Sequence, residues 1–438
     1  MKIALSSASA IGAWFVIRLM AEGHKVDYYL SNSKAEGVLS GLIPRPKVLD
    51  IDQRRHVLGY GFPNYYDYDL SLFDFTGQSK QADSSRASLV PTLGDGYFEN
   101  LLEDDRQYGI EAMEFSEIKV PPYERFDSPD NAKAFLRKRD RRYVFKPFVE
   151  GGRVPDSAST YVSRDSADML RTIDKLFSHA KGNPFILQEF VTGTEVSVEG
   201  WFNGTDFSCL CGTLEEKKFL NDNKGPNTGC AGVLVFTLSP SSRLYEETLK
   251  KTIPLLKNAG FRGVIDLNTI VAEGGDKIFG LEWGPRLGYL CCPVSSVMYG
   301  PGYADFILAV AKGAQPQERW QAPFGAAITV SIPPYPTEIL IPSAEGIPIE
   351  GLDPCSPQEL CEFFLHDARL DKTRERLETC GHYGYIGAPI GYGGTLEESF
   401  AMVERKLQKL HIPNMQYRTD IRARTLARYG ALSLRSWL

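Results

Sequence analysis

The sequence predicts an α/β protein that begins with a parallel sheet and later forms a β-hairpin with acidic residues on one face. Three observations support this prediction. The N-terminal residues alternate between strand and helix patterns. The chain has 438 residues, which is too long for one core and indicates two or three domains. Two β-like runs flank a Glu-Gly-Gly-Asp turn within residues 263–288.

The N-terminal segment predicts a β-α-β unit. Strands are expected at Ile3–Ser6 and Val26–Leu30, with an apolar-periodic helix at Ile11–Glu22 between them. Small residues at Ser7–Ala10 form the turn before the helix, and two interpretations stay open. The turn either brings the helix N-terminus close to an anionic ligand or only packs the helix against the strand. The GxGxxG pattern is absent, which argues against a dinucleotide site.

A third strand is expected at Leu70–Phe75, followed by a polar turn at Thr76–Lys80. Ligands bind at this edge of open α/β sheets, so Lys80 is either a substrate contact or part of an ordinary surface loop. A helix is predicted at Glu99–Tyr108, ended by Gly109-Ile110.

The next segment predicts a helix, a strand and a glycine-rich loop. Asp127-Ser128-Pro129 is typical of a helix start, and the helix is expected to extend to about Arg139. Tyr143–Lys146 is a predicted strand. The loop after it contains Gly151, Gly152 and Arg153. A lysine at a strand end before such a loop can hold and cover phosphates.

The middle of the chain predicts two strands, Phe185–Phe190 and Val196–Phe202, joined by a turn through Glu195. A charged stretch, Leu214–Lys224, leads into Gly225–Gly229, whose glycines and proline predict a loop. The following helix is expected at Ser242–Ala259.

The hairpin strands are predicted at Val264–Val271 and Lys277–Trp283. A three-residue turn at Gly274–Asp276 would pair Glu273 with Lys277 and Val271 with Phe279. The charge pair and the apolar pair favour this register over that of a two-residue turn.

In that register Asp266, Asn268, Glu282 and Gly284 share one face, because side chains alternate along a strand. Two carboxylates and an amide form an oxygen site suited to Mg²⁺ held with the phosphates of a nucleotide. The alternative is a pair of solvated acids on an exposed face. Apolar residues throughout both strands favour the metal site, because they indicate burial on both faces.

The C-terminal part predicts a domain junction and one well-marked helix. Residues Pro323–Pro357 are rich in proline and predict irregular strands. Thr395 is expected to cap a helix at Leu396–Leu410, with Glu398 completing a capping box.

Composition excludes several classes of protein. The net charge of −6 argues against a protein built mainly for nucleic acid, and the basic run Arg137–Arg142 is expected to be a solvated helix end. The eight cysteines show no CxxC pair, which predicts reduced thiols in a cytoplasmic protein. No run is long enough for a membrane helix, and the N-terminus lacks a signal-peptide pattern.

Taken together, these segments resemble the ATP-grasp superfamily, and most of all its glycinamide ribonucleotide synthetase (phosphoribosylamine–glycine ligase) family. The motifs that carry the resemblance, in order of specificity, are GPNTG at Gly225–Gly229 with the basic pair Lys217-Lys218 before it, QEFVTGTE at Gln188–Glu195, LEWGPRLG at Leu281–Gly288 and the stretch from Tyr392 to Ile421. Asp266 in GVIDLN fits the wider superfamily.

The resemblance implies three domains: an N-terminal Rossmann-like domain at 1–110, an ATP-grasp domain at 111–325 with a lid at about 125–195, and a small β-rich C-terminal domain at 326–438. It also implies ATP as the nucleotide and Mg²⁺ (or Mn²⁺) as the metal. The substrates would be a small-molecule carboxylate and an amine, and the protein would be a monomer or a homodimer.

The resemblance assigns roles to particular residues. The implied ATP contacts are Lys146, Gly151, Gly152, Arg153, Glu189, Val191 and Glu195, and the implied metal ligands are Asp266 and Glu282. Arg286, Lys217 and Asn227, the last two within or beside the GPNTG motif, would face the acyl phosphate and the acid substrate. Gly284 stands where the family has a third metal ligand, an asparagine, and our hypothesis is that Asn268 or a water replaces it.

The N-terminal loops depart from the family. Ser6–Gly12 replaces the GxGGREH loop and contains no arginine or histidine, and Thr76–Lys80 replaces GPExPL. The leading hypothesis is therefore an ATP-dependent carboxylate–amine ligase that acts on a different amine. The alternatives are a divergent phosphoribosylamine–glycine ligase, a nucleotide-binding protein without catalysis, and a modifier of a nucleic-acid-linked amine that uses Arg137–Arg142.

Overall fold

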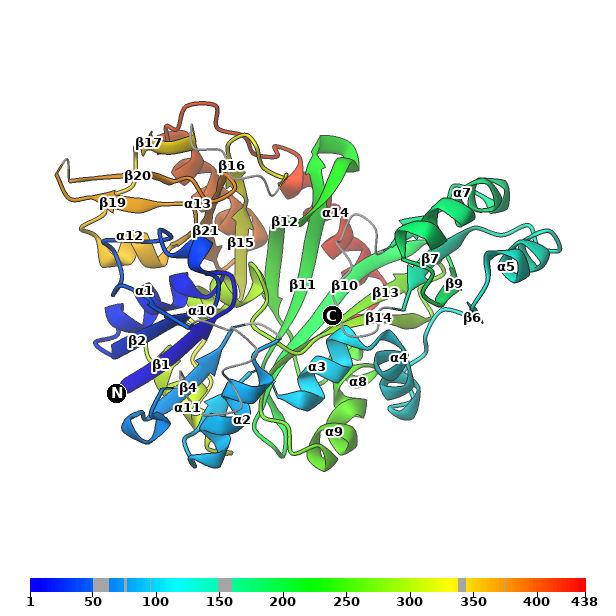
Figure 1. The fold of residues 1–438 in the computed structure, drawn as a ribbon, viewed down its shortest axis with the longest axis horizontal. Coiled ribbons are helices and arrows are strands. Elements are labelled where there is room, and N and C mark those ends of the chain that lie inside the picture. Colours follow the sequence, from blue (N-terminus) through cyan, green and yellow to red (C-terminus); the bar gives the residue numbers. More distant parts are fainter. Residues whose placement is uncertain (50–62, 75–76, 95, 149–159, 338–343, 374) are drawn as a thin grey trace.

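The computed structural model describes residues 1–49, 63–74, 77–94, 96–148, 160–337, 344–373 and 375–438 (Figure 1). The predicted Gly151, Gly152 and Arg153 lie outside the described residues. The described chain forms four sheets with helices packed on them.

The N-terminal strands form a five-stranded parallel sheet in the order β3-β2-β1-β4-β5. This confirms the predicted β-α-β start. The strands are β1 (Lys2–Ser7), β2 (Lys25–Leu30), β3 (Lys47–Val48), β4 (Leu70–Phe73) and β5 (Thr92–Leu93). Helices α1 (Ala13–Ala21) and α2 (Ser79–Ala87) accompany this sheet. Short 3₁₀ turns occur at Ser33–Ala35 and Tyr65–Asp67. Lys80 lies in the first turn of α2 and is exposed, so the loop predicted at this position is wrong.

Two helices connect this sheet to the rest of the molecule, α3 (Tyr97–Asp104) and α4 (Arg106–Phe115). The predicted helix end at Gly109-Ile110 is wrong, because α4 continues through both residues. Gly109 packs against the Trp283 ring, and the Trp283 Nε1 donates to the Gly109 carbonyl at 2.9 Å. The helix thus needs a residue without a side chain at this contact, and the glycine does not end it.

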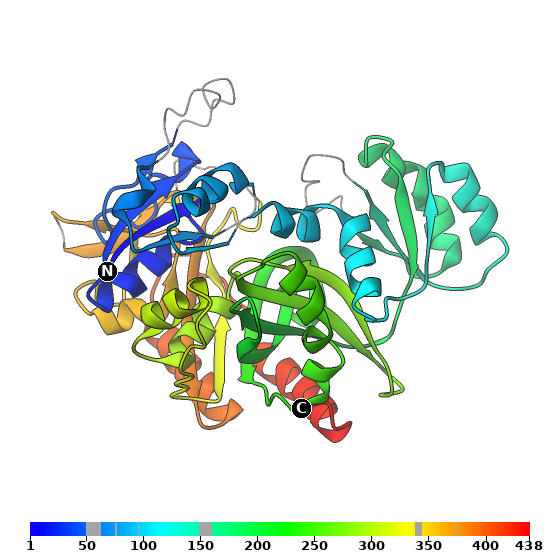
Figure 2. The same ribbon diagram turned by 90° about the horizontal axis from the view of Figure 1, so that it is seen from below.

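A separate four-stranded sheet has the order β6-β9-β7-β8 and carries two helices. Its elements are β6 (Tyr123–Phe126), α5 (Pro129–Leu136), β7 (Tyr143–Pro147), β8 (Tyr161–Val162), α7 (Ser166–His179) and β9 (Phe185–Glu189). Ser128 caps α5 by accepting a hydrogen bond from the Asp130 N–H, as predicted. This unit has its own apolar core and projects from the main body (Figures 1 and 2).

A nine-stranded sheet forms the centre of the molecule, with the main order β14-β13-β10-β11-β12-β15-β21-β16 and β18 paired to β21. The strands are β10 (Gly193–Phe202), β11 (Phe207–Leu220), β12 (Lys224–Thr237), β13 (Gly263–Ala272), β14 (Ile278–Gly284), β15 (Phe324–Ile328), β16 (Val330–Ser331), β18 (Phe363–Leu365) and β21 (Tyr385–Gly393). Residues Gly225–Gly229 belong to β12, so the predicted loop is wrong. A 3₁₀ turn at Asn221–Asn223 reverses the chain instead.

The remaining elements surround the central sheet. They are α8 (Arg243–Glu246), α9 (Leu249–Asn258), α10 (Cys291–Tyr299), α11 (Tyr303–Ala311), β17 (Glu345–Ile349), α12 (Pro357–Cys361), β19 (Arg369–Asp371), β20 (Arg376–Cys380), α13 (Leu396–Lys409) and α14 (Ile421–Leu434). The predicted capping box of Thr395 and Glu398 is present at α13. The eight cysteines are all free thiols. Among the described residues, no helix is both long and apolar enough to cross a membrane.

The basic run Arg137–Arg142 follows α5 and lies before β7. Its arginines contact neighbours within the same unit. Arg141 forms an ion pair with Glu189, and the Arg142 guanidinium lies 3.7 Å from the centre of the Phe190 ring.

The hairpin places its acids on the predicted face, but its strand pairing near the turn differs from the prediction. Next to the turn, Val271 pairs with Ile278, one residue away from the predicted partner Phe279. A β-bulge between Asn268 and Thr269 then restores the predicted alignment. Beyond the bulge, Asn268 lies opposite Glu282 and Asp266 opposite Gly284. The predicted shared face of Asp266, Asn268 and Glu282 is therefore confirmed, and the predicted turn register is wrong.

The C-terminal helix is joined to the central sheet by a buried charge cluster. Glu216 on β11 is only 2% exposed and forms ion pairs with Arg418, Arg424 and Arg428. Arg418 also pairs with Asp420 and donates to the Lys218 carbonyl at 2.8 Å. An acid this deeply buried needs such partners, because an isolated buried charge is strongly destabilising.

Candidate active site

Three polar side chains of the hairpin lie side by side on one face of the central sheet. The Asn268 Nδ2 is 3.3 Å from the Glu282 Oε1. Across the strand pair, a Cβ placed on Gly284 would lie 3.5 Å from the Asp266 Cβ. The missing side chain at Gly284 thus leaves room beside Asp266. The Asp266 Oδ1 is buried and has no hydrogen-bond partner among the residues that the structure describes, and burial raises the pKa of this carboxyl well above its usual value.

Lys217 on β11 faces these acids. Its Nζ lies 3.3 Å from the Glu282 Oε1 and 3.9 Å from the Glu215 Oε2. The Lys217 ammonium lowers the pKa of Glu282 to about 2, and in return Glu282 raises the pKa of Lys217. A cation is therefore already matched to the Glu282 carboxylate in the ligand-free chain.

Lys146 ends β7 in the projecting unit, and its side chain is buried. Burial, and then the Arg106 guanidinium, lower the pKa of Lys146 to about 8, while Glu282 and Glu195 act in the opposite direction. These influences place Lys146 near the acids of the hairpin, although they lie on a different sheet.

Arg106, at the start of α4, is a residue that the sequence analysis missed. Its Nε donates to the Pro147 carbonyl at 3.1 Å, and its charge acts on both Lys146 and Glu282. No motif marks it, because it enters the site through the packing of α4 against the end of β7. It adds a second cation beside Lys146, where phosphate groups would be held.

The residues predicted to contact the nucleotide base and ribose lie at the end of β9, at the start of β10 and between these strands. The Glu189 N–H donates to the Pro122 carbonyl at 2.7 Å, and the Glu189 side chain pairs with Arg141. Val191 is half-buried between the two strands, and Glu195 is exposed on β10. The Glu195 side chain is therefore available to a ligand, whereas the Glu189 amide is already bonded.

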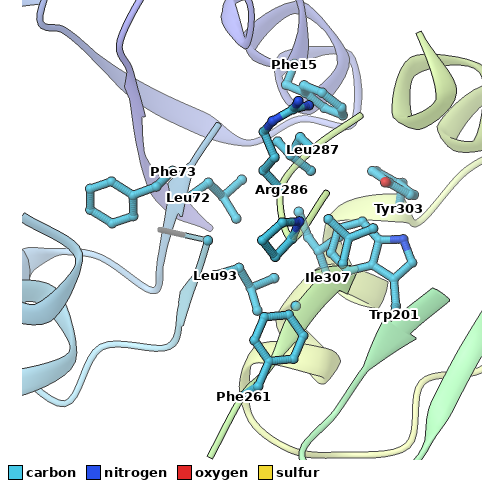
Figure 3. A pocket seen from close by; sticks show the side chains of 14 residues that line it. Phe15, Leu72, Phe73, Leu93, Trp201, Phe261, Arg286, Leu287, Tyr303 and Ile307 are labelled. Carbon is cyan, nitrogen blue, oxygen red and sulfur yellow. The ribbon is translucent and has the colours of Figure 1, made fainter. Parts of the chain in front are cut away.

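Arg286 lies where the N-terminal sheet meets the central sheet. Its Nε donates to the Glu103 Oε1 at 2.9 Å, a partner that the sequence analysis also missed. Arg286 lines an apolar pocket together with residues from both halves (Figure 3). The other lining side chains labelled there are Phe15, Leu72, Phe73, Leu93, Trp201, Phe261, Leu287, Tyr303 and Ile307.

The GPNTG segment continues this site along β12. Asn227 is exposed and pairs with Lys218 across the β11–β12 ribbon, next to Lys217. The Thr228 hydroxyl donates to the Lys217 carbonyl at 2.8 Å. A Cβ on Gly229 would lie 3.4 Å from the Tyr289 ring. The motif thus holds Lys217 in place and approaches the segment that follows Arg286.

A buried acid on β10 was not identified from the sequence. Glu199 is 1% exposed and is the cross-strand partner of Asp266. The Cys292 thiol donates to its Oε2 at 3.6 Å. Burial raises the pKa of Glu199 to about 7. No motif marks Glu199 in the sequence, because it lies within a run of apolar residues.

The donor set fits a magnesium–nucleotide complex better than a site for a metal ion alone. Among the described residues, no group of three or more His, Cys, Asp and Glu side chains is arranged to hold a metal ion. Asp266, Asn268 and Glu282 offer oxygen ligands only, and the Asp266 Oδ1 lacks a partner. Mg²⁺ is commonly held by one or two carboxylates plus phosphate oxygens, which matches this partial set.

Comparison with known proteins is consistent with this arrangement. Residues 104–289 match the family model of the phosphoribosylglycinamide synthetase ATP-grasp (A) domain. The phosphoribosylamine–glycine ligase of Thermotoga maritima is 25% identical over 328 residues, covering 73% of this chain and 77% of that protein. The corresponding protein of Halalkalibacterium halodurans is 22% identical over 340 residues, covering 74% of this chain and 75% of its own length.

Solved structures show the same fold. The phosphoribosylamine–glycine ligase structure from Thermotoga maritima superposes with a TM-score of 0.72 at 18% identity, covering 96% of this chain and all (100%) of that one. N5-carboxyaminoimidazole ribonucleotide synthetase from Thermus thermophilus gives a TM-score of 0.60 at 13% identity, with 93% and 97% coverage. Biotin carboxylase from Campylobacter jejuni gives 0.63 at 12% identity, with 95% and 92% coverage.

Residues 104–289 thus match an ATP-grasp domain, and the chain has the fold of these solved enzymes. The curated relatives that it matches are phosphoribosylamine–glycine ligases.

The lowered pKa of Lys146 predicts a pH dependence. Below pH about 8 the Lys146 ammonium is charged and attracts phosphate oxygens, and above it the charge is lost. We therefore expect kcat/KM for ATP to fall as the pH rises through about 8, since kcat/KM reports on groups of the free enzyme. A Lys146→Arg variant, which stays charged, should not show this fall. An identical alkaline fall in that variant would assign it to another group.

Proposed function

We propose that this protein is an ATP-dependent carboxylate–amine ligase. It activates a carboxylate, glycine or another amino acid, as an acyl phosphate and couples it to an amine, releasing ADP and phosphate. The observation that carries this proposal is the convergence of Lys146, Lys217, Asp266 and Glu282, which come from four strands of two sheets. Such an arrangement neutralises and positions phosphoryl groups.

In the phosphorylation of the carboxylate, one set of residues binds ATP and another would hold Mg²⁺. Lys146 and Arg106 hold the phosphates of ATP, and Glu195 binds the ribose. Gly151, Gly152 and Arg153 are also proposed to contact the phosphates, and the backbone near Glu189 and Val191 to contact the base. Asp266, Glu282 and Asn268 would hold Mg²⁺, which when bound neutralises charge on the transferring phosphoryl group.

The reaction then needs no covalent bond to the protein. An oxygen of the substrate carboxylate attacks the terminal phosphorus of ATP, and the bond to the bridging oxygen breaks as ADP leaves. Arg286, Lys217 and Asn227 face the acyl phosphate and hold it in place. The amine nitrogen then attacks the acyl carbon, the carbon–oxygen bond to the phosphate breaks with its electron pair, and the nitrogen loses a proton. Positioning and charge neutralisation dominate both steps.

A second candidate is a divergent phosphoribosylamine–glycine ligase. The names of the most similar relatives favour it. The two candidates share the ATP chemistry and the acid substrate, and they differ only in the amine.

The test is a screen for ADP release in which amino acids are crossed with amines, phosphoribosylamine included. We expect release that requires one acid and one amine together. ATP binding without amine-dependent release over a broad panel would contradict both candidates and favour a nucleotide-binding protein without catalysis. Salt-sensitive nucleic-acid binding that is lost on neutralising Arg137–Arg142 would instead support a nucleic-acid-linked amine as the substrate.

Asn268 provides a test of the metal site. If Asn268 replaces the ligand missing at Gly284, then Asn268→Ala should raise the Mg²⁺ concentration needed for half-maximal ADP release by about 10–100-fold. Asn258→Ala, a change at an exposed position at the end of α9, serves as the control. An unchanged Mg²⁺ requirement in Asn268→Ala would show that this residue is not a ligand and would leave the room beside Gly284 to a water.

A further inference from the structure

An aspartate occupies the turn between β1 and α1. The Asp74 side chain is 1% exposed and lies just past the end of β4. Its Oδ2 accepts hydrogen bonds from the Ser7 hydroxyl and, at 2.7 Å, from the Gly12 N–H. Its Oδ1 accepts from the Ala8 N–H at 3.4 Å. The carboxylate is thus bound by the same turn that the sequence analysis considered as an anion site.

This turn has the features of a cradle for an anion. It lies at the C-terminal edge of a parallel sheet and at the N-terminus of α1, where backbone N–H groups and the helix dipole favour negative charge. Gly12, the residue before the helix, has no side-chain cap of its own. A Cβ on Gly12 would lie only 2.6 Å from the Asp74 Oδ2, so glycine is needed for this close approach. The cradle is therefore built around the chain's own carboxylate.

Among the described residues, the groups bonded to the Asp74 carboxylate carry no positive charge. The groups that bind its carboxylate are a hydroxyl and backbone N–H groups. His366 lies against the Ser9 backbone, and burial lowers the pKa of its imidazole to about 3, which keeps it neutral. Arg18 on α1 is engaged elsewhere, because it pairs with Glu22 at 3.0 Å and donates to the Gly300 carbonyl. None of these described groups therefore offsets the charge of a second anion.

The turn is close in the sequence to residues that line the pocket of Arg286. Phe15 of α1 and Phe73, which precedes Asp74, line the same pocket as Arg286 (Figure 3). A substrate held by the N-terminal half and presented to the acyl group near Arg286 would therefore pass this edge of the sheet. An anionic group on that substrate would meet the Asp74 carboxylate at the place where the turn would otherwise bind it.

We propose that Asp74 is a specificity-determining residue and that the amine substrate of this ligase carries no phosphate group. The inference rests on the proposed carboxylate–amine ligase function. A phosphate monoester could enter the turn only by displacing a buried carboxylate that three groups bind, or by lying beside it. Displacement leaves a buried charge without partners, and close approach brings two anions together in a site of low polarity.

The first experiment compares matched amines that differ only in the phosphate. ADP release is measured with ribosylamine against phosphoribosylamine, and with ethanolamine against phosphoethanolamine, each with the acid that the screen identifies. We expect kcat/KM for the unphosphorylated member of a productive pair to be higher by on the order of 100-fold. Equal or faster turnover of the phosphorylated member would overturn the inference and leave the ligase function intact. No release with any amine would contradict the proposed function instead.

The second experiment does not depend on catalysis. The backbone amide resonances of Ala8 and Gly12 are followed while inorganic phosphate is added to the full chain saturated with ADP, so that the nucleotide site is filled. In the wild type they should not shift at millimolar phosphate. In Asp74→Ala, which empties the cradle, and in Asp74→Asn, which removes the charge but keeps the shape, they should shift, and more strongly in Asp74→Ala.

The control for this experiment is Asp69→Ala. Asp69 lies at the opposite end of β4, is exposed, and accepts a hydrogen bond from the Lys2 N–H at 2.8 Å. This variant should behave as the wild type does. Phosphate-dependent shifts at Ala8 and Gly12 in the wild type would overturn the inference, because they would show that phosphate enters despite Asp74. Shifts absent from both Asp74 variants, with their folds intact by circular dichroism, would overturn it too, because the turn would then not be an anion cradle.

Discussion

Replacing Glu282 with glutamine is expected to lower the rate of ADP formation by about 10²–10³-fold, the cost of removing one group that stabilises developing charge. The change keeps the shape of the side chain and removes its charge. Glu282 is the proposed ligand with the clearest ionisation, because Lys217 lowers its pKa to about 2. Without it, Lys217 would face only Glu215 among its two acidic partners, and Mg²⁺ would lose a charged ligand.

The control is Glu273→Gln at the turn of the same hairpin, where the side chain is exposed. It should leave the rate unchanged, since it alters the charge of the hairpin without touching the proposed site. The two rates are measured at saturating ATP over a range of Mg²⁺ concentrations. Equal activity of Glu282→Gln and Glu273→Gln would show that Glu282 is not a metal ligand.

The largest expected effect on stability is at Trp437. Trp437→Ala should lower the free energy of unfolding by about 3–5 kcal/mol, because it leaves a large cavity in a packed region. The indole is fully buried, and the Arg243 guanidinium lies 3.9 Å from the centre of its ring. Its Nε1 donates to the Gly275 carbonyl at 2.9 Å, which attaches the turn of the acid-bearing hairpin to the end of the C-terminal helix. Urea unfolding followed by circular dichroism measures the change.

Trp437→Phe separates packing from hydrogen bonding. It keeps most of the apolar volume and leaves the Gly275 carbonyl without its donor, so a loss of about 1–3 kcal/mol is expected. Leu434→Ala, at an exposed position near the end of the same helix, should change stability little. Equal stability of Trp437→Ala and the wild type would show that this contact does not hold the hairpin turn.

The shared face of the hairpin acids was predictable because strand periodicity is a local property. In the predicted register and in the observed one, Asp266 lies opposite Gly284 and Asn268 lies opposite Glu282. The acids and Asn268 therefore share one face whether the turn or the bulge sets this alignment. The sequence alone did not distinguish the two routes. The bulge depends on how Thr269 and its neighbours pack against β10, where the Thr269 hydroxyl donates to the Val196 carbonyl at 2.6 Å.

Residues that reach the site through packing were not predictable in the same way. Glu103 on α3 and Arg106 on α4 lie far along the chain from their partners in the site. No pattern within their helices marks them, because an arginine or glutamate on a helix is ordinarily solvated. Their roles follow from the packing of the two helices, which brings Arg106 to the Pro147 carbonyl and Glu103 to Arg286.

Glycine and proline misled the prediction in two places. Gly225–Gly229 was predicted as a loop, yet it continues β12, since a long two-stranded ribbon tolerates glycines where another segment such as Tyr289 approaches closely. Gly109 was predicted to end a helix, yet the helix continues because Trp283 occupies the space that a side chain would take. In both places a tertiary contact explains the residue better than local backbone preference does.

The Glu216 cluster determines whether the proposed catalytic domain can be produced as a shorter protein. A truncation before Arg418 would remove all three arginines that pair with this acid and leave its charge stranded inside β11. Such a fragment is expected to be poorly folded and to aggregate, even though its boundary would fall outside the matched ATP-grasp segment. Chimaeras meant to exchange amine selectivity should therefore retain the final helix of the recipient and graft only the N-terminal portion.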